Sequence, residues 1–212
     1  MYICTKLIIF MKNSFKLFDF MGTPVYLKYW FFLFLLFGIN TFVTFFIAVL
    51  VHELAHTFVA KKFNLPVSSV CLDFLFGSAG VDTTYTPYGQ TILVSIAGPL
   101  SNLLLSGLGW LLLNNGGADT FLAGFLLTFT SYNFILFVFN MLPIYPMDGG
   151  RISKAICQWV TKPSIGRKIN GYISIISSIL LLVFCIYSSM YILAIFCFLF
   201  IYMGYTEIKQ KY

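Results

Sequence analysis

Charged residues are scarce in this chain of 212 residues. Asp, Glu, Lys and Arg make up 9% of it, against about 25% in an ordinary soluble domain, whereas 59% of its residues are apolar. So few polar groups leave no room for a soluble domain of the usual size beside a membrane part. Apolar runs of about 20 residues, long enough to cross a bilayer, recur along the chain. We therefore expect a polytopic helical membrane protein.

Several other signals are missing. The five cysteines are scattered, odd in number and without a Cys-x-x-Cys spacing, so we interpret them as packing residues rather than as disulfides or metal ligands. No cleavable signal with a small-residue site is evident at the N-terminus. The net charge of +6 does not require a nucleic-acid partner, because basic residues that flank membrane spans on the cytoplasmic side produce the same excess.

Turn signals divide the apolar sequence into six expected spans. These are residues 24–38, 41–60, 89–113, 120–141, 169–187 and 190–206. Residues 63–88 differ, since they are β-branched and punctuated by Gly and Pro, and they predict two short strands. The predicted fold class is an all-α polytopic membrane protein with about six transmembrane helices and a short β-hairpin between helices 2 and 3.

The basic residues indicate the orientation of the chain. In a six-span arrangement, all thirteen lie on the side that holds both termini and the connector 144–168. The positive-inside rule makes this side cytoplasmic. The expected organisation is an N-terminal interfacial arm over 1–23, a six-helix membrane domain over 24–206 and a cytoplasmic tail over 207–212.

The only two histidines of the chain lie four residues apart in the second expected span. His52 and His56 therefore share one helix face, with Glu53 next to the first of them. Two imidazoles so placed can bind one zinc ion, and the glutamate can reach a water beside it. Each ionisable group inside a membrane costs about 2.5 to 3.5 kcal/mol, so three within five residues need a compensating partner such as a divalent cation. The alternative is that the histidines only join helices through hydrogen bonds.

A third zinc ligand is expected among the remaining acidic residues, and the topology favours Asp148. This residue follows the fourth span at its cytoplasmic end, and His52 lies only about 13 Å from the cytoplasmic end of its own helix. Two prolines before Asp148 forbid a continued helix, while Gly149 and Gly150 permit a sharp turn back towards the histidines. An ordinary Asp-Gly turn between helices is the alternative.

Small and polar residues also recur inside the third and fourth spans. Ser95, Gly98 and Asn102 form part of one stripe along which a neighbouring backbone can approach closely. Asn133 and Asn140 share a face of the fourth span. Asn140 and Asn102 are candidates for binding substrate or the developing oxyanion. The alternatives are that Asn140 fixes the turn after the span and that Asn102 serves helix packing.

Three motifs in this order and spacing are highly specific. HExxH is met by His52, Glu53 and His56, SxAGPxxN by Ser95, Ala97, Gly98, Pro99 and Asn102, and NxxPxxPxDGG by Asn140, Pro143, Pro146, Asp148, Gly149 and Gly150. In these motifs, within a core of residues 41–151, the sequence resembles the site-2 protease family of intramembrane zinc metalloproteases. Neither the PDZ insertion nor the C-terminal nucleotide-sensing domain that some members carry is found.

The resemblance implies a zinc metalloprotease that cleaves a peptide bond in or near a substrate's transmembrane segment. One zinc ion would be held by His52, His56 and Asp148, with Glu53 as acid and base. The loop 67–85 would be a re-entrant β-hairpin, bent at Gly77 and Gly80, whose edge accepts the substrate as a further strand. The site would lie near the cytoplasmic face.

The resemblance also limits the partners. Substrates would be single-pass or membrane-tethered proteins such as anti-sigma factors, pro-sigma factors or remnant signal peptides, with the lipid bilayer as surroundings and no nucleic acid. Two other functions are considered. A catalytically inactive membrane adaptor of the same fold would tolerate loss of a key residue, and none is lost here. A zinc transporter would need polar residues through both leaflets, and the outer halves of the spans are nearly featureless.

Overall fold

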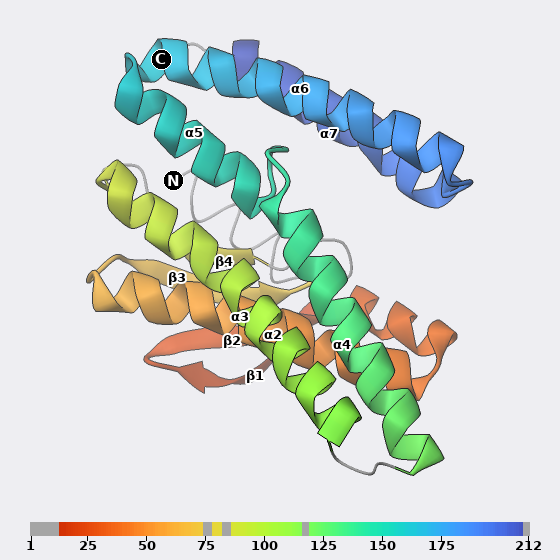
Figure 1. The fold of residues 1–212 in the computed structure, drawn as a ribbon. Helices are drawn as coiled ribbons and strands as arrows, with labels where there is room; N and C mark the ends of the chain where they lie inside the picture. The colour runs from red at the N-terminus through yellow and green to blue at the C-terminus, as the bar shows by residue number, and fades with distance from the viewer. Residues whose placement is uncertain (1–12, 74–77, 82–85, 116–118, 210–212) are drawn as a thin grey trace. The chain divides into compact units, whose positions relative to one another are not determined.

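The computed structural model describes residues 13–73, 78–81, 86–115 and 119–209 (Figure 1). The chain divides into two compact units. The first comprises Met1–Tyr85 and Leu100–Leu136, and the second comprises Thr86–Pro99 and Phe137–Tyr212. The described residues form mostly helices, together with one small sheet.

A four-stranded sheet in the order β1-β2-β3-β4 belongs to the first unit. Its strands are β1 (Ser14–Phe20), β2 (Thr23–Lys28), β3 (Val67–Leu72) and β4 (Ser78–Val81). β2 and β3 are parallel, and the two outer pairings are antiparallel. β3 and β4 confirm the two strands predicted within 63–88. β1 and β2 were not expected, and they turn the predicted hairpin into one half of a larger sheet whose edges are β1 and β4.

The expected first transmembrane helix at 24–38 is wrong. These residues form β2 and a 3-10 helix, η1 (Tyr29–Phe37), and residues 14–20 of the expected interfacial arm form β1. Fifteen residues of α-helix would cover about 22 Å, which is short of the roughly 30 Å of a bilayer core. Strand and 3-10 helix cover more length per residue, about 3.3 Å and 2.0 Å, so β2 and η1 together have a summed length of about 38 Å.

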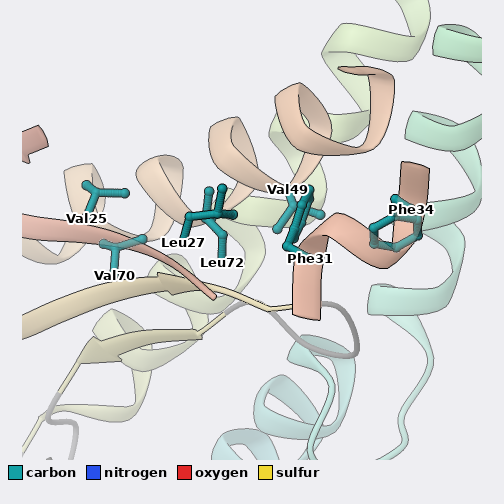
Figure 2. Packing of buried hydrophobic residues seen from close by; sticks show 7 residues of the cluster. All are labelled: Val25, Leu27, Phe31, Phe34, Val49, Val70 and Leu72. Atoms are coloured by element: carbon teal, nitrogen blue, oxygen red, sulfur yellow. The ribbon is translucent and has the colours of Figure 1, made fainter. Parts of the chain in front are cut away.

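The core of the first unit explains why β2 is extended. Alternate residues of β2, beginning at Thr23, are buried, as a period of two demands. Figure 2 shows how the buried side chains of β2, β3, η1 and helix α2 (Ile39–Lys62) meet in one cluster. Its members are Val25, Leu27, Phe31, Phe34, Val49, Val70 and Leu72. The segment from β2 to η1 therefore packs along α2, and Gly38, at φ +97°, joins η1 to that helix.

Among the described residues, four helices are long and apolar enough to cross a membrane. They are α2, α3 (Tyr88–Asn115), α4 (Thr120–Met141) and α6 (Pro163–Tyr187). They confirm, as helices, the expected spans at 41–60, 89–113, 120–141 and 169–187. The run expected at 190–206 forms helix α7 (Tyr191–Lys209).

The second unit contains a helix inside the expected connector 144–168. This helix, α5 (Asp148–Val160), packs on α6, and α6 packs on α7 where Gly171 and Gly204 let the two backbones approach (Figure 1). Glu207 was expected in a cytoplasmic tail. It lies instead in α7, 2% exposed, with its carboxylate 2.7 Å from the ammonium of Lys154 on α5. The ion pair explains why a carboxylate is tolerated there.

Candidate metal centre

The two histidines lie on the buried face of α2. Thr44, Ala48, His52, His56 and Ala60, spaced by four, are all buried, so the helix keeps one face against the protein. His52 is 6% and His56 is 4% exposed. Their Nε2 atoms are 3.1 Å apart. Both imidazoles therefore present the same ring nitrogen to one point, as the spacing predicted.

Asp148 completes a group that can hold a metal ion. One ligand atom from each of His52, His56 and Asp148 lies within 4.8 Å of the other two, and all three residues are buried. Tetrahedral zinc with Zn–N distances of about 2.0 to 2.1 Å separates two nitrogen ligands by about 3.3 Å, close to the separation of the two imidazoles. Two imidazoles and a carboxylate are also a usual donor set for catalytic zinc. The residues present fit that ion.

Asp148 is the first residue of α5, and the chain leading to it is tightly folded. After α4 ends at Met141, Met147 N–H donates to the carbonyl of Ile144 at 2.8 Å, and Tyr145 N–H donates to Ser174 Oγ on α6 at 2.9 Å. A side chain at Gly150 would place its Cβ 2.5 Å from the Ile144 carbonyl group. One at Gly149 would meet the carbonyl oxygens of Met141 and Leu142. The two glycines therefore let the start of α5 lie directly against the backbone of residues 141–144.

Glu53 is 5% exposed and lies on α2, a helix that packs against β3. The charge of Glu53 acts on the thiol of Cys71, near the end of β3. Burial raises the pKa of the Cys71 thiol to about 11, and the charges of Lys28, Asp73 and Glu53 act on the same thiol. Cys71 is therefore an unreactive packing residue at neutral pH. The ammonium of Lys28 and the carboxylate of Asp73 are 2.6 Å apart, a pair that the sequence alone did not suggest.

Asn102 on α3 contacts His52 directly. Its Oδ1 is 2.5 Å from His52 Nδ1, and its Nδ2 donates to the carbonyl of Ala48 at 3.1 Å and to Asn133 Oδ1 at 2.9 Å. Asn133 Nδ2 in turn donates to the carbonyl of Phe129 at 2.9 Å. Asn102 and Asn133 are both fully buried. Asn133 was not a predicted site residue, although the polar face that it shares with Asn140 was its signal in the sequence.

The other predicted site residues lie on α3 and at the end of α4. Ser95, Gly98 and Pro99 are buried on α3. Asn140 is half-buried in the last turn of α4, and Pro143 follows it in the connection to α5. Gly80 lies in β4, where a Cβ would collide with Ser68 Oγ of β3, so close approach is the reason for that glycine. Gly77 lies outside the described residues.

Known proteins resemble this chain in sequence and fold. The family model of peptidase family M50 matches residues 40–123 and 115–184. A zinc metalloprotease of Methanocaldococcus jannaschii is 32% identical over 208 residues, covering 92% of this chain and 60% of the relative. Stage IV sporulation protein FB of Bacillus subtilis is 34% identical over 107 residues, covering 49% of this chain and 35% of the relative.

A solved structure agrees with these matches. The site-2 protease from Methanocaldococcus jannaschii superposes with a TM-score of 0.66 at 26% identity, covering 94% of this chain and 97% of that chain. The chain spans less than two thirds of the length of both curated relatives, 60% and 35%. Because the family model covers most of the chain and the metal-binding group lies within the matched region, this chain belongs to peptidase family M50, the site-2 protease family.

Proposed function

We propose that this protein is an intramembrane zinc metalloprotease that hydrolyses a peptide bond in or near the transmembrane segment of a membrane-anchored substrate. The observation that carries the proposal is the buried group of His52, His56 and Asp148, with Glu53 beside it on the helix that supplies both histidines. Three buried ionisable residues so close together have no structural purpose that apolar residues would not serve at lower cost.

The protein groups have separate parts in this chemistry. When bound, zinc would act as a Lewis acid that polarises the peptide carbonyl and acidifies water. The carboxylate of Glu53 takes a proton from the attacking water and passes it to the leaving amine. Asn140 is the candidate donor to the developing oxyanion. It is half-buried at the end of α4, and Asp148 follows it by eight residues.

A helical substrate must unwind before it can be cut, because its carbonyls are engaged in its own hydrogen bonds. An open strand edge can replace those bonds. β4 is an edge of the sheet, and both β4 and its partner β3 contact α2, the helix that carries Glu53. We therefore propose that the substrate adds as a strand along β4.

A cysteine at Val81 on β4 is expected to cross-link to a cysteine in the extended part of a trapped substrate. The matched control is a cysteine at Ser14 on β1, the opposite edge of the same sheet. The Glu53→Gln protein would serve as the trap, and the products would be separated by gel electrophoresis. Equal cross-linking at the two edges, or cross-linking only at Ser14, would contradict substrate addition to β4.

The orientation with both termini in the cytoplasm, and with the site near that face, is also a proposal. β2 and η1 together cover about 38 Å, and the 24 residues of α2 cover about 36 Å, so the N-terminal segment can cross beside α2 although it is not an α-helix. The basic residues would then remain on one side. A reporter fused after Tyr212 would show on which side of the membrane the C-terminus lies, and we expect the cytoplasmic side.

The Glu53→Gln variant tests the proposed activity. Cleavage of a coexpressed membrane-tethered substrate is expected to fall by about 10²- to 10⁴-fold, because an amide cannot accept and return the proton. Zinc content should equal that of the parent protein, because Glu53 is not one of the three ligands. Cleavage would be followed by immunoblotting and zinc by mass spectrometry of the purified protein. The control is Asp19→Asn, which neutralises an exposed carboxylate.

The same experiment separates the other two functions. Undiminished cleavage by Glu53→Gln would reject the acid and base role. An adaptor would show no cleavage by the parent protein with any substrate tested. A zinc transporter would change cellular zinc uptake in proportion to its expression. Suitable first substrates are single-pass proteins of the anti-sigma, pro-sigma and remnant signal-peptide classes.

A further inference from the structure

We propose that Asn102 and Asn133 form a directional hydrogen-bond chain that sets the tautomer of His52 and aims its Nε2 lone pair at the metal position. Asn102 is then a positioning residue rather than a substrate-binding one. This proposal rests on the proposed function, because the direction of the Nε2 lone pair matters only if zinc binds there. The residues that form the chain, on α2, α3 and α4, all lie in the first unit.

The direction of the chain starts at a group that cannot reverse. The carbonyl of Phe129 only accepts hydrogen bonds, so the Asn133 atom 2.9 Å from it must be the donor Nδ2. Asn133 therefore presents Oδ1, an acceptor, to Asn102. The atom of Asn102 at 2.9 Å from that oxygen must again be Nδ2. The amide of Asn133 is oriented by its own helix.

A second carbonyl gives the same orientation for Asn102. Its Nδ2 is also 3.1 Å from the carbonyl oxygen of Ala48, which only accepts. Both N–H donors of Asn102 are therefore used by protein acceptors, and neither is left for a substrate. Its Oδ1 consequently faces His52 Nδ1 at 2.5 Å. Reversing the Asn102 amide would set its N–H₂ group against the imidazole and its oxygen against two acceptors, the Ala48 carbonyl oxygen and Asn133 Oδ1.

The proton of His52 follows from this orientation. An acceptor at Nδ1 keeps a proton there, so Nε2 carries the lone pair. Nε2 is the atom that lies 3.1 Å from the Nε2 of His56, on the side of the metal position. Hydrogen-bond partners of this kind fix the tautomer and orientation of ligating histidines, and losing one typically weakens metal binding 10- to 100-fold. Burial of all three side chains excludes water as a substitute.

Two variants separate positioning from packing. Asn102→Leu removes the acceptor at similar volume. Ser106→Ala is the matched control, since Ser106 is buried one turn further along α3 and donates to the carbonyl of Thr130 on α4 at 3.0 Å. Thermal unfolding of each purified protein in detergent reports whether the fold is retained.

Zinc affinity, measured by competition with a chelating dye, is the first readout. We expect Asn102→Leu to weaken binding about 10- to 100-fold. Ser106→Ala should equal the parent protein. Parental zinc affinity in a folded Asn102→Leu protein would overturn the proposal. So would a Ser106→Ala protein that loses as much affinity as Asn102→Leu.

A second readout needs no variant that could misfold. Because the chain has only two histidines, ¹⁵N-histidine labelling gives two imidazole signal sets in the zinc-free parent protein. We expect His52 to carry its proton on Nδ1, and we expect this preference to persist in Ser106→Ala. A proton on Nε2, or an even mixture of tautomers, would overturn the proposal. Neither readout measures cleavage, so an error in the proposed substrate or activity would leave this test intact.

Discussion

The Asp148→Asn variant is expected to bind zinc more than about 100-fold less tightly than the parent protein. Losing a ligand should cost more than losing a residue that only orients one, for which 10- to 100-fold is typical. Asparagine keeps the size of the side chain but removes the negative charge that balances the cation among buried groups. Zinc affinity would be measured by chelator competition, and proteolysis of the same preparation would be followed at limiting zinc.

The control for Asp148→Asn is again Asp19→Asn, because Asp19 pairs with Lys16 at an exposed site. It should leave zinc affinity unchanged. Retention of parental affinity by Asp148→Asn would show that the carboxylate is not a ligand. The family's metal chemistry could not then be assigned to this group.

The Gly150→Ala variant is expected to lose both stability and zinc. Its new Cβ would lie 2.5 Å from the Ile144 carbonyl group, and neither backbone can rotate away as a side chain can. Overpacking of this kind costs about 1 to 3 kcal/mol, and a clash between two backbones lies at or above the upper end. The relief available is a shift of the segment that begins α5, which carries Asp148. Zinc affinity should therefore fall together with the temperature of unfolding.

Gly124→Ala is the matched control for Gly150→Ala. A Cβ at Gly124, inside α4, would meet nothing within 4 Å among the described residues. Alanine in a helix interior is favoured over glycine by up to about 1 kcal/mol, so this variant should be as stable as the parent or more so. Both unfolding temperatures would be measured in one detergent. A Gly150→Ala protein with parental stability and zinc affinity would contradict the close backbone approach.

The N-terminal region shows where local patterns were insufficient. Residues 24–38 have the composition of a span but only 15 positions, too few for an α-helix to cross the bilayer core. Their strand and 3-10 conformation depends on β2 pairing with β3, about 45 residues later, and on packing against α2. A pairing between distant segments has no signature in either segment alone.

The metal centre, too, was only partly predictable from the sequence. Helical periodicity by itself placed His52 and His56 on one face with Glu53 next to them, and the proline and glycine pattern placed Asp148 at a turn, because these are local consequences of backbone geometry. Tertiary structure alone decided that Asn102, supported by Asn133, meets His52 Nδ1. The direction of that hydrogen-bond chain depends on three helices packing in register, and such packing is a property of side chains from distant positions that no single stretch of sequence contains.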